Sequence, residues 1–271
     1  MGFKKSQEEI QRHKEETLKT LDSLLSGFTE NPSKVDKICY WIKDYAKYIK
    51  QEENFKPSNL KAYKRGEIIK ANLGFNVGAE FGGLHYCVVV SKDNSIYNPV
   101  ITIVPLTSVK NDITKSMHKG NLLLGTTIFD SLMKKLETTR SECGQLIETC
   151  KKTNLECEQE RAHILQMVSQ NTDKDKILQS QNSLATIVLQ NQRNLMLTYE
   201  KLNEADRMIN ELKKMKKGSI ALVSQITTIS KIRIYNPKRG SDTLANVRVS
   251  NENMNMIDAE IRELYTLNKQ V

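Results

Sequence analysis

The sequence predicts an α+β protein, in which a β-rich domain is interrupted by a long antiparallel helical hairpin and preceded by helices. Over residues 61–127, apolar residues form short runs bounded by glycine, asparagine and proline, as in strands. Over residues 128–216 they recur every seven residues instead, as in paired helices. The strand pattern returns over residues 218–271. We therefore expect a discontinuous β-rich domain with an inserted hairpin, and a helical N-terminal extension over residues 1–57.

Two helices are expected in the N-terminal extension, over residues 5–27 and 33–52. Both carry aliphatic residues at helical spacing, and the second has the more regular apolar stripe. Asn31-Pro32 marks its start, because proline is favoured at the first helical position. The single tryptophan, Trp41, lies beside that stripe, where an aromatic residue more often packs than contacts a ligand.

The β-rich domain has seven runs of strand character, followed by a terminal helix. The runs are expected at Glu67–Leu73, Tyr86–Ser91, Val100–Leu106, Leu122–Leu124, Ser219–Ile226, Ile229–Ile234 and Leu244–Val249, and the helix at Asn251–Leu267. Residues 74–83, between the first two runs, hold four glycines, Glu80 and Phe81. Such a loop lets its backbone approach a ligand closely, or lets the loop open and close.

Chemically useful side chains follow this glycine-rich loop. His85 stands at the entry of the next strand, and Thr107 and Ser108 are two hydroxyls at the exit of the strand after it. We expect any site of the domain to lie here.

The expected hairpin has two heptad patterns joined by a polar turn at Asn171–Asp175. The first pattern runs from Phe129 to Ile164 at steps of seven, and the second from Ile177 to Leu212. Their companion positions are Leu132, Leu146 and Met167 on the first helix, and Val188, Leu195, Leu202 and Ile209 on the second. Two such helices with a short connection should fold back on each other as an antiparallel coiled coil, forming an arm about 60 Å long.

Three cysteines of the arm lie at steps of seven, at Cys143, Cys150 and Cys157. This spacing separates neighbours by about 10 Å on one helix face. That is too far for one zinc ion or for a disulfide within the helix, so we expect small core residues and no metal. Asn191, a polar member of the second pattern, is expected to fix the helix register.

Composition narrows the function classes. The formal net charge is +9, from 41 Lys and Arg against 32 Asp and Glu, which favours a polyanionic partner such as nucleic acid. Solvated lysine-rich helix faces are the alternative explanation. No apolar run approaches the roughly 20 residues that span a bilayer, so we expect no membrane partner. Five cysteines without a signal-peptide pattern favour free thiols in a reducing cytoplasm.

Four motifs, in order, resemble the MazF/PemK toxins of toxin–antitoxin systems. They are the strand start Lys64-Arg65-Gly66-Glu67, the loop Gly78-Ala79-Glu80-Phe81-Gly82-Gly83, the strand from Pro99 to Leu106-Thr107-Ser108, and Gln225-Ile226-Thr227-Thr228-Ile229. The resemblance covers about 115 residues of the β-rich domain and its terminal helix. The N-terminal extension and the arm do not belong to the common form of the family.

The resemblance implies a small SH3-like barrel that forms a homodimer, and cleavage of single-stranded RNA within short sequence motifs without metal or cofactor. It also implies a cognate antitoxin that blocks the RNA groove. The residues carried over are His85 and Thr107 as catalytic residues, and Lys64, Arg65, Lys70, Glu80, Phe81, Gly82, Gly83, Ser108, Gln225 and Thr227 as RNA-binding residues. Among these, Glu80 is expected to orient the loop, and Gln225 to read a base edge or to hold a loop.

The sequence departs from the family at three positions. His85 stands where most members have an arginine, Tyr86 where they have proline, and Thr227 where an arginine is frequent. Histidine, with an unperturbed pKa near 6.5, can still act as base or acid near neutral pH. We therefore expect His85 to transfer a proton, with Thr107 donating to a phosphate oxygen and Lys64, Arg65 or Lys70 supplying positive charge.

Three functions remain open from the sequence. The first is a sequence-selective endoribonuclease toxin that uses attack by the RNA 2′-hydroxyl. The second is a catalytically impaired module that binds nucleic acid or a protein partner through the barrel and coiled coil. Inhibition of DNA gyrase by the same barrel shape has less support, because the motifs present are those of RNA cleavage.

Overall fold

The computed structural model describes residues 5–109 and 118–267, and it divides into two compact units. The N-terminal unit comprises Met1–Phe55 and Leu73–Gly83, and the barrel unit comprises Lys56–Asn72 and Leu84–Val271. The glycine-rich loop therefore groups with the N-terminal helices, whereas the arm groups with the barrel. The three-part organisation expected from the sequence stays a prediction.

Two helices form most of the N-terminal unit, as predicted. Helix α1 spans Gln7–Gly27 and α2 spans Pro32–Glu52. Ser6 and Glu9 close a capping box at the start of α1. Asn31 caps α2, its side chain accepting a hydrogen bond from the amide of Lys34 at 3.1 Å, with Pro32 at the first helical position.

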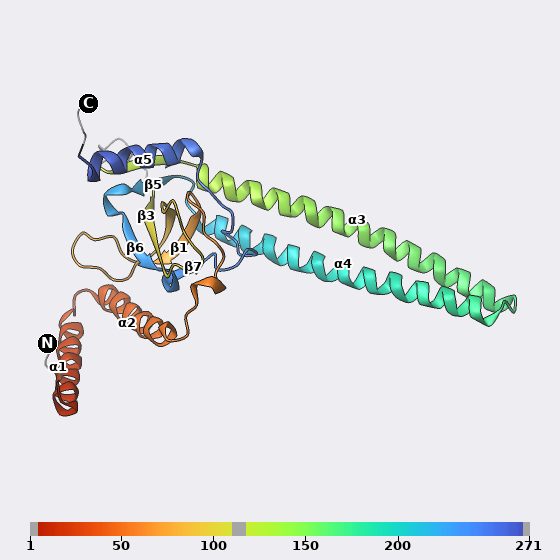
Figure 1. The fold of residues 1–271 in the computed structure, drawn as a ribbon, viewed down its shortest axis with the longest axis horizontal. Helices are drawn as coiled ribbons and strands as arrows, with labels where there is room; N and C mark the ends of the chain where they lie inside the picture. Colours follow the sequence, from red (N-terminus) through yellow and green to blue (C-terminus); the bar gives the residue numbers. More distant parts are fainter. Residues whose placement is uncertain (1–4, 110–117, 268–271) are drawn as a thin grey trace. The chain divides into compact units, whose positions relative to one another are not determined.

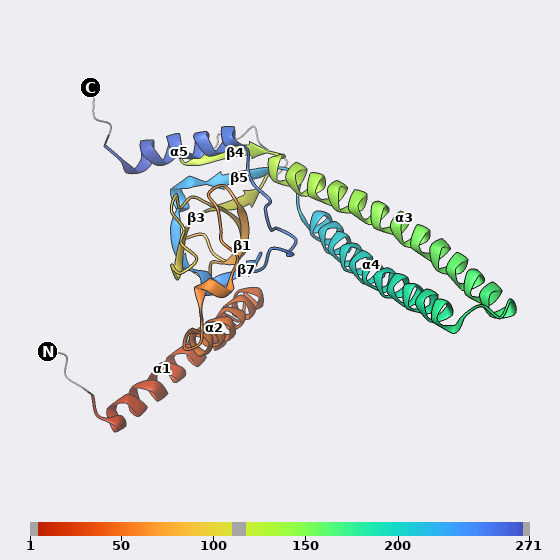
Figure 2. The ribbon, with the colours of Figure 1, turned by 45° about the vertical axis from the view of Figure 1, so that its right-hand side comes forward.

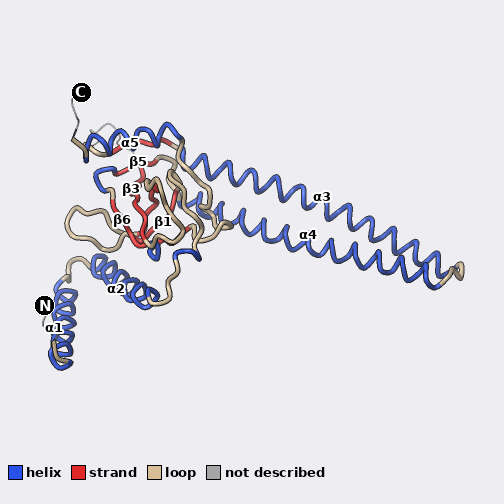
Figure 3. The backbone as a smooth tube through the Cα atoms, viewed as in Figure 1, coloured by secondary structure: helices blue, strands red, loops and turns tan. Residues whose placement is uncertain are grey.

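Antiparallel strands form the sheet of the barrel unit (Figure 3). They are β1 (Ile68–Asn72), β2 (Leu84–Val89), β3 (Val100–Ser108), β4 (Asn121–Gly125), β5 (Ser219–Leu222), β6 (Thr227–Ser230) and β7 (Ile234–Asn236). Their order is β4-β5-β3-β2-β1-β7, with β6 paired to β3 as well. Because β6 lies on β3 and β7 lies on β1, and only the short 3₁₀ helix η3 (Lys231–Arg233) separates them, the sheet curls into a small barrel. The predicted α+β class is confirmed.

Both faces of the central strands are buried. One face belongs to the main hydrophobic core, to which Ile68, Val88 and Val104 contribute together with residues of the arm and of helix α5 (Asn251–Tyr265). The alternating residues of the same strands, among them Ile69 and Ile103, are fully buried on the other face. The position of a residue along these strands therefore decides on which face of the sheet its side chain lies.

The arm is inserted between β4 and β5, which are neighbours in the sheet. Helix α3 (Thr127–Ser169) and helix α4 (Lys174–Lys214) pack along each other and leave the barrel as a hairpin (Figures 1 and 2). Asp173 caps α4 by accepting a hydrogen bond from the amide of Asp175 at 3.3 Å. The arm is anchored at its base, because Leu132 and Met208 are fully buried within the main core.

The seam of the arm matches the first predicted heptad pattern. On α3, Cys143 and Cys150 are buried and Cys157 is half-buried, all as free thiols. The second pattern was predicted correctly at Asn191 and Thr198, which are buried.

Three of the four companion positions on α4 were wrong by one residue. Val188, Leu195 and Leu202 are 39%, 51% and 46% exposed. The half-buried positions precede them, at Ile187, Asn194 and Lys201. The fourth companion, Ile209, is half-buried and packs against the main core, as predicted. A charged residue is accommodated at this seam because Lys201 pairs with Glu142 of α3 at 2.6 Å.

The last strand expected from the sequence was also wrong. Residues 244–249 form turns and a single bridge between Arg248 and Glu67, because Asn246 has a φ of 64° that ends any extended run. The expected strand at Ile229–Ile234 is split by η3 into β6 and β7, which pair with different neighbours.

Candidate functional site

His85 and Thr107 lie just beyond one end of the β2–β3 ladder. The last pair of this antiparallel ladder joins Cys87 to Pro105, and each of the two residues lies two positions further along its own strand. The period of two puts both on the same face of the sheet. Both residues are half-buried, and β3 pairs with β5 from Leu106 onward. The two residues predicted to be catalytic therefore share a face of the sheet at the same end of the ladder.

The opposite face of the same strands carries an ion pair with the arm. Lys70 and Tyr86 are register partners on β1 and β2. Lys70 Nζ lies 2.8 Å from Glu211 Oε1 of α4, and the Tyr86 hydroxyl donates to the same oxygen. The Lys70 ammonium also lies 4.9 Å from the centre of the Tyr86 ring.

These contacts shift two pKa values. Burial raises the pKa of Tyr86, and its hydrogen bond to Glu211 raises it further. Burial opposes ionisation of Glu211, but the hydrogen bonds from Lys70 and Tyr86 outweigh it, so the pKa of this carboxyl is lowered. Lys70 is therefore occupied by the arm and lies on the other face of the sheet from His85.

Lys64 and Arg65 lie at the far end of the β1–β2 ladder. The turn that contains them is fixed at Gly66, whose amide donates to Val89 O at 2.8 Å. His85, by contrast, pairs with Ala71 near the other end of β1.

Each charged residue of this turn has a defined environment. The Arg65 guanidinium donates to Val90 O and to Asp258 of α5. Lys64 is exposed, and its amide donates to the buried carboxylate of Glu67, which also pairs with Lys61. The family-like Lys-Arg-Gly-acid motif thus acts here as a turn and as an attachment point for α5.

The glycine-rich loop belongs to the N-terminal unit. Its ends meet at a narrow neck, where the amide of Gly83 donates to Gly74 O at 2.6 Å and the amide of Leu73 donates to Gly83 O at 2.8 Å. A Cβ at Gly82 would lie 2.5 Å from Gly74 O, so a side chain does not fit there. Glu80 is exposed, and Phe81 is half-buried.

The remaining predicted residues lie at the end of β3, in a short 3₁₀ helix and on β6. Ser108 is half-buried and pairs with Ser219, beside Thr107. Gln225 is half-buried in the short 3₁₀ helix η2 (Val223–Gln225). Thr227 is exposed and pairs with Ile103 of β3, four residues before Thr107.

Sequence analysis missed Arg233. It ends η3, and its Nε donates to Asn72 O at 2.8 Å. The next residue, Ile234, pairs with Ala71, which pairs with His85 on its other side. Arg233 therefore lies at the same end of the barrel as His85. The available signal was an arginine a few residues after the late family-like motif, but its position depends on the 3₁₀ turn between β6 and β7.

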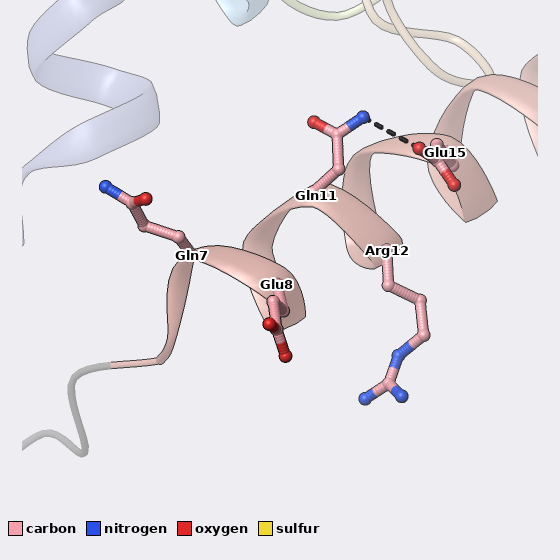
Figure 4. A pocket seen from close by; sticks show the side chains of 5 residues that line it. All are labelled: Gln7, Glu8, Gln11, Arg12 and Glu15. Carbon is pink, nitrogen blue, oxygen red and sulfur yellow. Dashed lines mark hydrogen bonds between the residues drawn. The ribbon is translucent and has the colours of Figure 1, made fainter.

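Two surface hollows lie on the N-terminal helices. One is bordered by five side chains of α1, where Gln11 Nε2 donates to Glu15 Oε1 at 2.7 Å (Figure 4). The other lies at the turn between α1 and α2. Within residues 5–109 and 118–267, no group of three or more His, Cys, Asp or Glu side chains is arranged to hold a metal ion. In the same part of the chain, no helix combines the length and apolar character needed to cross a membrane.

One comparison with known proteins identifies a domain. Residues 64–132 match the family model described as the PemK-like, MazF-like toxin of type II toxin–antitoxin systems. The match begins at the turn of Lys64, includes His85 and Thr107, and ends at Leu132 in α3. No curated protein matches the chain. The predicted resemblance is confirmed over residues 64–132, which are similar to the PemK-like, MazF-like toxin family.

Proposed function

We propose that this protein is a sequence-selective, metal-independent endoribonuclease that cleaves single-stranded RNA, and that it acts as a toxin held in check by a cognate antitoxin. The observation that supports the proposal is that His85 and Thr107 lie on one face of the sheet, each two residues beyond the last pair of the β2–β3 ladder, inside the family-matched segment. The type II toxin–antitoxin class supports the antitoxin partner and an RNA target. A homodimer and a cytoplasmic location belong to the same proposal.

The reaction needs two proton transfers and one stabilised anion. A base removes the proton of the 2′-hydroxyl, the O2′–P bond forms, and the P–O5′ bond breaks as an acid protonates the leaving 5′-oxygen. The products are a 2′,3′-cyclic phosphate and a 5′-hydroxyl. His85 performs one of the two transfers, and the Thr107 hydroxyl donates to a nonbridging phosphate oxygen as negative charge develops there.

Arg233 is the cation that we propose for this phosphate. Lys70 is paired with Glu211 on the other face of the sheet, and Lys64 and Arg65 lie at the other end of the ladder. Arg233 is held at the His85 end by its bond to Asn72 O. A guanidinium suits phosphate because its donors form a planar fork.

The test uses the purified full chain with end-labelled single-stranded RNA in EDTA. Cleavage at a short recurring motif, leaving 2′,3′-cyclic phosphate ends, is the expected result. RNA that stays intact over a range of protein concentrations would overturn the proposal. A mixed-sequence pool should be used, because the cleaved motif is unknown.

A specific observation favours the second candidate, a module with impaired catalysis that binds nucleic acid or a protein partner. Two of the cations carried over from the family, Arg65 and Lys70, are engaged by Asp258 and Glu211. Fewer carried-over charges are then available for a phosphate. Intact RNA that nevertheless migrates as a complex with the protein in a native gel would support this candidate.

A further inference from the structure

The backbone of the glycine-rich loop is approached closely by a side chain of the same chain. A Cβ placed on Gly74 would lie 2.9 Å from Cζ2 and 3.1 Å from Cη2 of Trp41. These distances are shorter than ordinary van der Waals contact, so the indole packs directly on the glycine backbone. Gly74 also has a φ of +93°, which other residues rarely adopt. A close approach was expected of a ligand at this loop, and Trp41 makes it.

Trp41 is one member of an aromatic group on α2. Its ring centre lies 5.9 Å from that of Tyr45 and 6.3 Å from that of Tyr48, both in tilted arrangements. Tyr45 is 54% exposed, so part of this group still faces solvent. Tyr40, on the same helix, is 63% exposed and serves as a reference position.

The loop presents a defined shape to α2. The neck formed by Leu73, Gly74 and Gly83 closes it at one end, and Asn76 Nδ2 donates to Phe81 O at 2.9 Å across it. A loop fixed in this way has one conformation to which an indole can be fitted. The helices and the loop therefore form one compact unit although 17 residues, Lys56–Asn72, separate them in the sequence.

We propose that α2 is a built-in cover for the glycine-rich loop, with Trp41 occupying the place where RNA approaches the backbone of Gly74. RNA that contacts the backbone of Gly74 then has to displace the indole, because the two would occupy the same space. The proposal rests on the proposed function in taking RNA as the competing ligand. Inhibition by a segment of the same chain then precedes any action of a separate antitoxin.

The first test uses tryptophan fluorescence of the unmodified chain. Trp41 is the single tryptophan, so the tryptophan emission comes from this residue alone. The probe is a mixed-sequence single-stranded RNA with a 2′-O-methyl group on every ribose, which removes the attacking hydroxyl and prevents cleavage. A shift of the emission to longer wavelength at saturating probe is expected, because the indole becomes exposed to water. Saturated binding without any change in emission would overturn the proposal.

The second test compares Trp41→Ala with Tyr40→Ala for binding of the same probe. In the parent, RNA binding has to include the free energy of displacing Trp41 from the loop. Removing the indole abolishes this cost, so we expect Trp41→Ala to bind the probe about 10-fold more tightly. Tyr40→Ala should bind within about 2-fold of the parent, because exposed residues contribute little to the closed form. Equal affinities for the two variants would contradict a cover.

The outcomes separate this inference from the cleavage proposal. Tighter binding by Trp41→Ala, with unmodified RNA left intact by every variant, supports the cover and rejects the ribonuclease. Cleavage by the parent with equal rates for both variants supports the ribonuclease and rejects the cover. If Trp41→Ala fails to fold, the fluorescence titration of the parent decides.

Discussion

His85 and Tyr86 are adjacent in β2 but lie on opposite faces of the sheet, and the two faces have different surroundings. On the Tyr86 face the arm reaches the strands, and Glu211 binds both Tyr86 and Lys70. The His85 face also carries Thr107, within the segment that matches the toxin family. One face thus joins the arm to the barrel, whereas the other carries the two residues that we propose to be catalytic.

The largest effect is expected on the rate of RNA cleavage when His85 and Tyr86 are substituted one at a time. His85→Ala should lower the rate of RNA cleavage by about 10²–10⁴-fold, the usual contribution of a positioned acid or base. Tyr86→Phe, the control, should leave the rate within a few-fold, because it removes only a hydroxyl bound to the arm. Initial rates on labelled RNA in EDTA measure both. Parental activity in the His85 variant, or equal losses in the two variants, would contradict the division of the faces.

The anchoring of the arm in the core gives the next largest effect. Met208 is fully buried at the base of the arm, so Met208→Ala should lower the free energy of unfolding by about 2–5 kcal/mol. Leu195→Ala on the same helix, where the side chain is 51% exposed, should cost less than about 1 kcal/mol. Urea unfolding of the full chain measures both values. Similar costs at the two positions would mean that the arm base is not part of the barrel core.

The ion pair between Lys70 and Glu211 should contribute a smaller, pH-dependent amount to the free energy of unfolding. Glu211→Gln should lower the free energy of unfolding by about 1–3 kcal/mol at neutral pH, because two hydrogen bonds to a half-buried charge are weakened. The pKa of Glu211 is lowered in the folded protein, so its contribution is complete above the ordinary carboxyl value of about 4.3. The contribution is lost as pH falls through the lowered value.

The measurement is the difference in unfolding free energy between parent and Glu211→Gln at several pH values. This difference should be constant near neutrality and should shrink in acid. A difference that persists at the lowest pH at which the protein stays folded would show that the carboxylate charge is not its source.

The smallest effect is expected in the distal arm, far from either face. Asn191 is buried, and its Oδ1 accepts no hydrogen bond, although its Nδ2 donates to Asn154. Asn191→Leu should therefore raise the free energy of unfolding by about 1 kcal/mol. Asn203→Leu, at an exposed position of α4, should change it by less than about 0.5 kcal/mol. Destabilisation by the first variant would indicate that the amide is needed for helix pairing.

Local patterns predicted most of the elements. The start of α2 followed from Asn31 and Pro32, and the seam of α3 from cysteines at steps of seven, because each depends on residues a few positions apart. Three companion positions of the α4 seam were placed one residue late, since Leu195 and Leu202 suggested an apolar stripe beside the true one. The leucines suggested that their own positions lie in the seam, whereas Asn194 and Lys201 occupy it.

Contacts between distant residues could not be predicted. Arg65 pairs with Asp258 and Lys70 with Glu211 across separations of 193 and 141 residues. No local pattern selects one carboxylate among many for such a pair. The packing of Trp41 on Gly74 is of the same kind, because it depends on how a loop and a helix assemble. Sequence therefore predicted the helices and strands better than it predicted which side chains meet.

The insertion point of the arm has a consequence for its length. Gly125 and Ser219, which flank the arm, are partners in the β4–β5 ladder, so the chain leaves and re-enters the barrel at one place. Removing or adding seven residues in each helix would keep the seam aligned and move the tip by about 10 Å. The length of the arm can therefore vary in steps of one heptad, while every strand of the barrel keeps its neighbours.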